Sequence, residues 1–187
     1  MEKVAKVPVQ VLVRVASLAD TKVVEALLRA SYPSLMAPGY PTDLLAQALP
    51  FMVRANPALL CSGTYYLAEE PEGTVIGCGG WTLERPGAAD MPVDPTLGHI
   101  RHFATHPNWT RRGVGKRLLD RCTTDALATG VCGFECYSSL VAEAFYSALG
   151  FAVIEPVMVG MGPGVAFPSV RMIRRLPDRD HQRAPAL

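Results

Sequence analysis

The most constraining feature of this 187-residue chain is a strand-like segment that leads through a basic glycine turn into a helix. The strand ends before Pro107, and the helix begins after Gly113. Such a turn presents free backbone N–H groups at the positive end of a helix dipole, where a pyrophosphate binds well. Side-chain cations surround the same point: Arg111, Arg112, Lys116 and Arg117. The segment therefore predicts a strand–loop–helix unit that binds a small anion.

Two common nucleotide-binding motifs do not fit the spacing of this turn. A P-loop requires G-x-x-x-x-G-K-[ST], but Arg117 follows Gly115-Lys116 and Thr110 stands where the earlier glycine is needed. A dinucleotide fingerprint requires G-x-G-x-x-G, but Leu118 stands at its third glycine position. A single G-x-G with nearby arginines can also be an ordinary surface turn that binds no ligand. A second motif is therefore needed before a ligand can be inferred.

Two segments resemble motifs of the GCN5-related N-acetyltransferase (GNAT) family. Thr110-Arg111-Arg112-Gly113-Val114-Gly115 is similar to its acetyl-CoA loop, [QR]-x-x-G-x-[GA], with Thr110 in place of Gln or Arg. About thirty residues later, the segment from Ser139 to Phe151 resembles the closing helix of the family, with Phe-Tyr followed by Leu-Gly-Phe. The family often has Asn where Ser139 stands. Because both motifs occur in the family's order and spacing, the chain is identified as a member over residues 11–175.

The resemblance implies an α/β fold. Its sheet is expected to be mixed and mostly antiparallel, with about six to seven strands, helices on both faces and a splayed central parallel pair. The length of 187 residues fits one domain on the usual prior of about 100–200 residues per domain. We expect an N-terminal extension over residues 1–10, a single GNAT acetyltransferase domain over 11–175, and a disordered tail over 176–187.

Hydrophobic periodicity and turn residues predict the secondary structure. Strands are expected at residues 11–15, 64–69, 74–83, 133–137, 151–154 and 170–173. Ser17 and Thr42 are expected to cap two helices, the first with Val23, Val24, Leu27 and Leu28 on its apolar side. Pro50 is expected to kink or end the second helix, and Gly130 to end the helix that begins at Gly113. Residues 31–41, 85–97 and the Gly/Pro-rich segment before residue 170 are expected to be loops.

The predicted strand 74–83 contains three glycines, which are unfavourable inside a strand. Gly77, Gly79 and Gly80 weaken a strand unless a bulge, a close backbone approach or a nearby ligand needs them. We expect one of these at this point of the sheet.

Composition narrows the class of protein. The net charge of +1 provides no broad basic face, so no nucleic-acid partner is expected. The five cysteines form no C-x-x-C pair and no zinc spacing with His, so no metal is expected. The chain shows no apolar leader and no stretch near the ~20 apolar residues of a membrane span, so no membrane partner is expected. We expect a cytoplasmic protein with reduced thiols; a homodimer is left open.

The resemblance implies acetyl-CoA as the co-substrate. Its pantetheine arm would pair with Phe103, Ala104 and Thr105, and its pyrophosphate would lie on the turn from Arg111 to Lys116. The residues that would hold the cofactor are Phe103, Ala104, Thr105, Arg111, Arg112, Gly113, Val114, Gly115, Lys116 and Ser139. Aromatic and thioether side chains of the first helical region would line the acceptor site: Tyr32, Tyr40, Phe51 and Met52.

The resemblance assigns Tyr146 the role of general acid toward the departing thiolate. His99 is the candidate general base, because a His with a pKa near ~6.5 accepts a proton close to neutral pH. By the period-two rule, His102 is expected on the opposite strand face. Glu69 and Glu84 are the carboxylate alternatives.

The function expected from these residues is direct acetyl transfer to a primary amine, since Tyr146 argues for an enzyme. A small-molecule amine is preferred because no acidic groove for a basic protein tail can be identified. The alternatives are a protein N-acetyltransferase and a non-catalytic acetyl-CoA-binding sensor or regulatory module.

Overall fold

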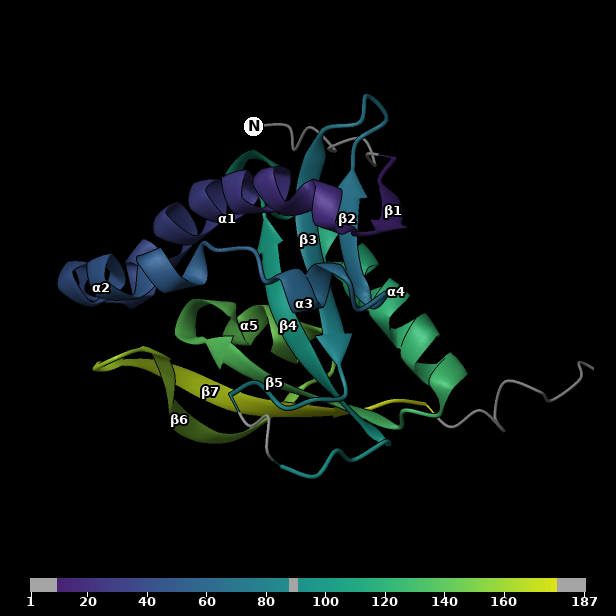
Figure 1. The fold of residues 1–187 in the computed structure, drawn as a ribbon. Coiled ribbons are helices and arrows are strands. Elements are labelled where there is room, and N and C mark those ends of the chain that lie inside the picture. Colours follow the sequence, from purple (N-terminus) through teal and green to yellow (C-terminus); the bar gives the residue numbers. More distant parts are fainter. Residues whose placement is uncertain (1–9, 88–90, 178–187) are drawn as a thin grey trace, which may run out of the picture.

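A single seven-stranded sheet organises the computed structural model, which describes residues 10–87 and 91–177 (Figure 1). The strands are β1 Leu12–Val15, β2 Tyr65–Glu69, β3 Val75–Thr82, β4 Leu97–Thr105, β5 Gly133–Ser139, β6 Ala152–Gly162 and β7 Val165–Arg175. Their order in the sheet is β1-β2-β3-β4-β5-β7-β6. Every neighbouring pair is antiparallel except β4–β5, which is parallel. The predicted mixed sheet with a central parallel pair is confirmed.

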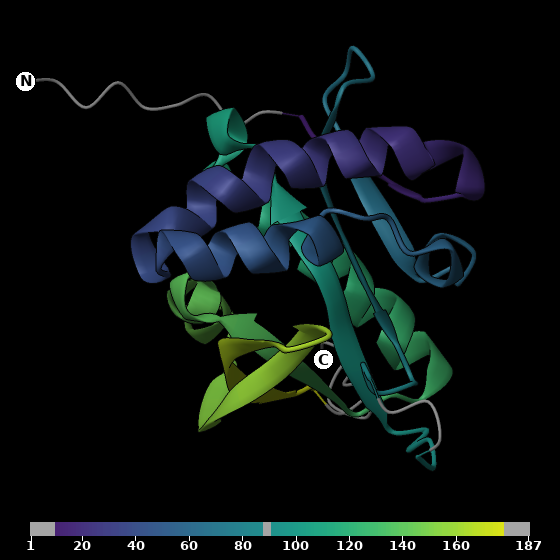
Figure 2. The ribbon, with the colours of Figure 1, turned by 60° about the vertical axis from the view of Figure 1, so that its left-hand side comes forward.

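Helices cover both faces of this sheet, as predicted (Figure 2). They are η1 Leu18–Asp20, α1 Thr21–Met36, η2 Ala37–Gly39, α2 Thr42–Met52, α3 Pro57–Leu60, η3 Pro107–Trp109, α4 Val114–Thr129, η4 Leu140–Ala142 and α5 Glu143–Ala148. Helices α1 and α2 pack in one hydrophobic cluster, and α4 and α5 in a second. The sheet separates the two clusters, so the β4–β5 pair lies between them.

Helix α4 follows the sequence prediction closely. Val114, Leu118, Cys122 and Ala126 recur at i+4 spacing and are all buried. The helix ends at Gly130, whose φ of 91° lies in the left-handed region that glycine adopts without strain. An apolar stripe between two glycines therefore fixes both the packing and the ends of α4.

The predicted loop at residues 31–41 is wrong, because α1 continues to Met36 and η2 follows it. Tyr32 and Met36 are buried and extend the apolar stripe of α1, so packing holds the helix together across Pro33. Val23 is exposed and does not belong to that stripe.

The predicted helix caps also require correction. Ser17 is an N-cap as expected, but of η1, where it forms a capping box in which its N–H and hydroxyl donate to the Asp20 carboxylate. Helix α1 follows η1 directly, and its own N-cap is Asp20. Pro41 rather than Thr42 is the N-cap of α2. Helix α2 runs past Pro50 to the buried Met52 before it ends.

The last two strands form one long hairpin and not two short strands around a loop. β6 and β7 have 11 residues each, and Gly164 with φ 73° lies in the turn between them. The prolines of this segment do not interrupt the hairpin; Pro156 lies on the edge strand β6, where proline is tolerated. The hairpin reaches α2, where the Phe51 ring lies against Gly162. This contact closes one side of the functional site.

The predicted hairpin of residues 64–69 and 74–83 is confirmed by β2 and β3. Residues 88–90 of the expected connection and most of both expected terminal segments lie outside the described residues. Leu176, next to β7, is buried in the core. None of the helices within residues 10–87 and 91–177 is long and apolar enough to cross a membrane, and the cytoplasmic location stays a prediction.

Candidate active site

The parallel strands β4 and β5 separate soon after they begin. Their pairing covers only Leu97–His99 of β4 against Gly133–Glu135 of β5. Beyond this point, β4 continues to pair with β3 and β5 with β7. The facing edges from Ile100 and Cys136 onward therefore border a gap, which is the predicted splay.

A β-bulge interrupts β4 at the start of this gap. Gly80 pairs with Arg101 and Cys78 with Ala104, so that His102 and Phe103 together oppose Gly79. His102 has a φ of 46°, which is left-handed and costly for a residue other than glycine.

The glycines of β3 fit against this bulge. A Cβ atom on Gly79 would lie 2.5 Å from the Phe103 ring, and one on Gly77 would lie 2.5 Å from Val114. The bulge and the close approach expected from these glycines are therefore both present.

Two tyrosine hydroxyls hold the bulged backbone in place. Tyr65 donates to the His102 carbonyl at 3.1 Å, and Tyr32 donates to the Phe103 carbonyl at 3.4 Å. The period-two rule that predicted the side of His102 does not apply through a bulge, because the alternation of side chains is broken there.

A cavity of about 320 Å³ occupies the gap. α1, α2, β4, β5, α5 and the β6–β7 hairpin all contribute to its walls. Of the predicted acceptor-site residues, Tyr32, Phe51 and Met52 line it. Tyr40 supports the wall instead, because its ring stacks on Phe167 at 4.2 Å.

The hydroxyl of Tyr40 joins three parts of the chain. It donates to the Pro168 carbonyl of β7 at 2.8 Å and accepts from the Leu140 N–H of η4 at 2.7 Å. Tyr40 thus ties the segment between α1 and α2 to the hairpin and to the entrance of α5.

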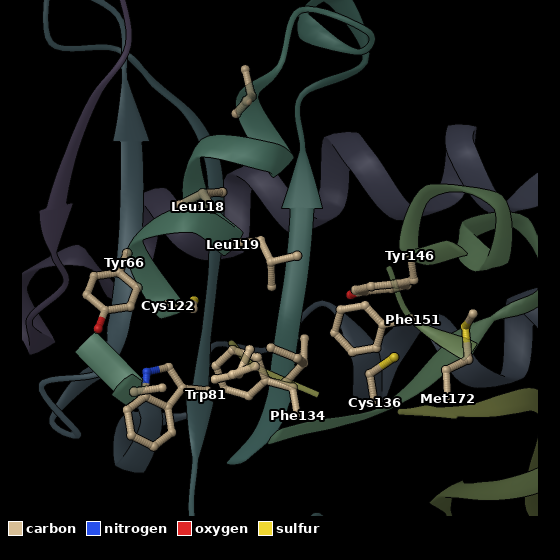
Figure 3. Packing of buried hydrophobic residues seen from close by; sticks show 14 of the residues in the cluster. Tyr66, Trp81, Leu118, Leu119, Cys122, Phe134, Cys136, Tyr146, Phe151 and Met172 are labelled. Atoms are coloured by element: carbon tan, nitrogen blue, oxygen red, sulfur yellow. The ribbon is translucent and has the colours of Figure 1, made fainter. Parts of the chain in front are cut away.

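Tyr146 of α5 lies at the boundary between the core and the cavity. The residue is 6% exposed, and its ring makes edge contacts with Phe103, Phe145 and Phe151. Figure 3 shows the Phe151 ring next to it. It lines the cavity, and among the described residues its hydroxyl has no hydrogen-bond partner. Burial raises the pKa of this phenol well above 10, so the hydroxyl keeps its proton at neutral pH. The raised pKa makes this hydroxyl a weaker acid than free tyrosine, so its position at the cavity, and not its acidity, favours a role as proton donor.

His102 supplies the imidazole of the cavity. Its side chain lines the cavity and has no hydrogen-bond partner in the part of the chain that the structure describes. Burial, and then the neighbouring Arg101 charge, lower its pKa to about 4. The ring is therefore neutral at pH 7 and has a free nitrogen lone pair.

His99 has different surroundings. It is buried outside the residues that line the cavity, and its Nδ1 lies 3.1 Å from Glu135 Oε2 without the alignment of a hydrogen bond. Burial lowers the pKa of His99, and the Glu135 charge opposes this. Glu135 also contacts Arg171 at 2.6 Å and Arg85 at 3.8 Å. This ion-pair cluster joins β4, β5 and β7 at the point where the parallel pairing ends.

The carboxylate alternatives also lie outside the cavity lining. Glu69 pairs with Arg14 at 2.8 Å across β1 and β2. Glu84 lines a second cavity of about 480 Å³, together with Arg101.

The thiol in the active-site cavity is inert. Cys136 lines the cavity and is buried, and burial raises its pKa to about 12. A thiol that stays protonated at neutral pH is a poor nucleophile. A covalent acetyl-cysteine step is therefore disfavoured at this position.

The glycine turn has the geometry of an anion site. Arg111 and Gly113 adopt left-handed φ values of 61° and 83°, and the N–H groups of the first turn of α4 have no carbonyl partner within the helix. A Cβ on Gly113 would meet no atom within 4 Å, so the space beside it is open. Arg112 lies over the Trp109 ring at 4.8 Å, and Lys116 pairs with Asp120 at 2.7 Å.

Gly115 brings this turn into contact with α5. A Cβ at Gly115 would lie 2.9 Å from the Phe145 ring, so only glycine lets α5 pack this closely on α4. The two motifs that are far apart in the sequence thus meet through one contact.

The predicted cofactor residues lie along one path between the turn and the cavity. Phe103 and Ser139 line the cavity, and Ala104 and Thr105 follow on β4. Because the His106 N–H bonds to Ile76 of β3, alternation points the N–H and C=O of Thr105 toward the gap. Within residues 10–87 and 91–177, no group of three metal-binding side chains is found.

The sequence did not indicate the contribution of the last hairpin to the site. Gly160, Met161, Phe167 and Ser169 line the cavity, but all four lie between the expected strands 151–154 and 170–173, in the segment that was expected to be a loop. The sequence did contain one relevant signal, because Gly79 indicated a bulge at this point of the sheet. It did not indicate which residue of β4 lies on the bulge.

Residues 61–153 match the family model described as an acetyltransferase (GNAT) domain. This range includes the β4–β5 gap, the glycine turn and Tyr146. The protein is therefore an acyltransferase of the GNAT class, and the family resemblance seen in the sequence is confirmed. A comparison with curated protein sequences found no match.

Solved structures share this fold. A GCN5-related N-acetyltransferase from Rhodopseudomonas palustris has a TM-score of 0.70 and 21% identity, covering 92% of this chain and 99% of that one. PaiA N-acetyltransferase from Thermoplasma acidophilum, in complex with coenzyme A, has a TM-score of 0.67 and 16% identity, covering 89% and 99%. N-acetylglutamate synthase from Neisseria gonorrhoeae, with coenzyme A and N-acetyl-glutamate, has a TM-score of 0.58 and 18% identity, covering 90% and 36%.

Proposed function

We propose that this protein transfers the acetyl group of acetyl-CoA directly to a primary amine of a small molecule. The observation that carries the proposal is the gap between β4 and β5, which has a glycine turn with left-handed φ values at one end and a cavity with an unbonded tyrosine hydroxyl at the other. The coenzyme A in the Thermoplasma acidophilum structure supports the same ligand for this chain.

The cofactor would lie along the predicted path. Its pyrophosphate would accept hydrogen bonds from the N–H groups of the turn at Gly113, and Arg111 and Arg112, which precede this glycine, would supply positive charge. Its pantetheine arm would pair with the open edge of β4 at Phe103 and Thr105, and Ser139 would meet the arm from β5. The thioester would then reach the cavity beside Tyr146.

The reaction needs a nucleophile, an oxyanion site and two proton transfers. The amine nitrogen attacks the thioester carbon, and a C–N bond forms as the C–S bond breaks. A backbone N–H of β4 at the bulge would stabilise the oxyanion, which is typically worth about 10²–10³ in rate per donor. Tyr146 would donate its proton to the departing thiolate.

We propose His102 as the acceptor of the amine proton, in preference to His99. His102 lines the cavity and has a free lone pair, whereas His99 lies outside the cavity lining beside Glu135. A pKa of about 4 makes His102 a weak base, but the amine nitrogen becomes strongly acidic as the C–N bond forms. The catalytic role of His99 stays a prediction that the variants in the Discussion test.

The alternatives find less support. Within the described residues, the cavity lining includes no acidic side chain, which a basic protein tail would need. A non-catalytic sensor would not need the unbonded Tyr146 hydroxyl.

Tyr146→Phe is expected to lower kcat while it leaves the affinity for acetyl-CoA nearly unchanged. The variant keeps the ring that packs on Phe145 and Phe151 and removes only the proton donor. Free-thiol release measures kcat, and calorimetry measures the affinity. An unaltered kcat with a good acceptor would assign Tyr146 to packing, with water as the proton source.

A further inference from the structure

The acceptor side of the cavity is apolar. Met36 of α1, Phe51 and Met52 of α2, Met161 of β6 and Phe167 of β7 form its walls. Methionine side chains adapt their shape to a ligand and make favourable sulfur contacts with aromatic rings. The volume of about 320 Å³ is at the lower end of the range of small-molecule sites, so the occupant is small.

The cations of the ion-pair cluster next to the cavity are neutralised by Glu135, and Arg101, which has no ion pair in the described residues, lines the second cavity instead. Among the residues that line the cavity in the described chain, none is Asp, Glu, Lys or Arg. The nearby cations Arg85 and Arg171 contact Glu135, and Arg171 also contacts Glu155 at 3.1 Å. An anionic group on the acceptor would find no free cation here, and a second ammonium group would find no free carboxylate.

Several of the neutral polar side chains that line the cavity already form hydrogen bonds within the protein. Ser138 donates to the Ser139 carbonyl at 2.8 Å, Ser169 donates to the Phe167 carbonyl at 3.2 Å, and Tyr32 donates to β4. Tyr137 accepts a hydrogen bond from Arg85. The polar side chains of the lining without a hydrogen-bond partner in the described residues are His102, Tyr146, Ser139 and the Cys136 thiol. The reaction uses the first two, Ser139 is proposed to meet the cofactor, and a thiol is only a weak donor.

We propose, on the basis of the acetyl transfer proposed above, that the acceptor is a small monoamine with an aromatic hydrocarbon body. Its amino group meets His102, and its ring lies among Phe51, Phe167 and the methionines. A carboxylate, a phosphate or a second amino group on the acceptor is selected against, because a buried charge without a partner is costly.

The test compares matched acceptors in the free-thiol assay with acetyl-CoA. 2-Phenylethylamine and phenylalanine differ by one carboxylate, and spermidine and glutamate represent the polyamine and acidic classes. We expect kcat/KM for 2-phenylethylamine to exceed that for phenylalanine by about 10²-fold. Spermidine and glutamate are expected to be poorer still.

A charge-introducing variant makes the test specific to this wall. Phe51 lies at the rim and is 39% exposed, so Phe51→Arg is expected to fold and to reduce the preference for 2-phenylethylamine over phenylalanine at least tenfold. Leu35→Arg is the matched control, because Leu35 is similarly exposed at 36% and lies outside the cavity lining. The control is expected to keep the wild-type ratio.

The outcomes separate this inference from the proposed function. Fastest thiol release with phenylalanine, glutamate or spermidine overturns the inference and leaves the acetyltransferase in place. An unchanged ratio in Phe51→Arg likewise overturns it. Thiol release with none of the amines, despite acetyl-CoA binding, overturns the proposed function itself.

Discussion

His102→Ala is expected to slow acetyl transfer by about 10²–10⁴-fold, the usual contribution of a positioned base. The variant removes the imidazole that lines the cavity, while the bulge keeps its hydrogen bonds from Tyr65 and Tyr32 to backbone carbonyls. The affinity for acetyl-CoA is expected to change little. The measurement is kcat/KM for a good acceptor, with the acceptor's own ionisation separated from the enzyme's.

The pH profile gives a second readout of the same prediction. His102 is active when neutral, and its pKa is about 4, so its acidic limb lies near pH 4 rather than near pH 6.5. His99→Ala is the matched control, since His99 lies three residues earlier on β4 but outside the cavity lining. If His99→Ala causes the larger loss and removes an acidic limb that His102→Ala keeps, His99 is the base and the assignment to His102 is wrong.

Gly113→Val is expected to weaken acetyl-CoA binding by about 10–100-fold. A β-branched residue at φ 83° is strained by about 1–3 kcal/mol, so the chain leaves the conformation that aims its N–H groups at phosphate. The added side chain also fills the open space beside the turn. Calorimetry with acetyl-CoA measures the loss of affinity.

Gly130→Val is the matched control for this variant. Gly130 ends the same helix with a φ of 91°, and a Cβ there also meets no atom within 4 Å. The strain is therefore similar, but it lies at the end of α4 away from the turn. Gly130→Val is expected to lower thermal stability and to keep wild-type affinity. Normal binding by Gly113→Val would mean that the pyrophosphate lies elsewhere.

Several parts of the fold around the site could be predicted from short segments of the sequence. The turn at Gly113, the buried stripe of α4 and the Gly130 end follow from glycine conformations and i+4 spacing. The β2–β3 hairpin follows from alternation around a turn. The pairing of β4 with β5 came from the family resemblance, because nothing in a single segment specifies its parallel partner.

The errors arose where tertiary packing overrides a local signal. Residues 31–41 were expected to form a loop and Pro50 to kink or end a helix. The buried Tyr32, Met36 and Met52 instead hold α1 and α2 together across their internal prolines. Glycines and prolines made β6 and β7 resemble a loop, although pairing with β5 and packing on α2 form a long hairpin.

The position of His102 could not be deduced from the strand pattern. Gly79 indicated an irregularity in the pairing of β3. A bulge, however, shifts the alternation of side chains on the partner strand, and the position of the bulge depends on the pairing register of the two strands. His99 was therefore the natural candidate from a regular strand. The three-dimensional arrangement instead brings the next histidine to the cavity.

The most direct test of the central claim is calorimetric titration of the purified protein with acetyl-CoA, in parallel for the wild type, Gly113→Val and Gly130→Val. Acetyl-CoA bound in the gap between β4 and β5 predicts a dissociation constant between about 1 μM and 1 mM for the wild type, as is usual for enzyme substrates. It further predicts the selective loss in Gly113→Val alone. No heat of binding from the wild type at an acetyl-CoA concentration of ~1 mM, or equal affinities in all three proteins, would contradict the account.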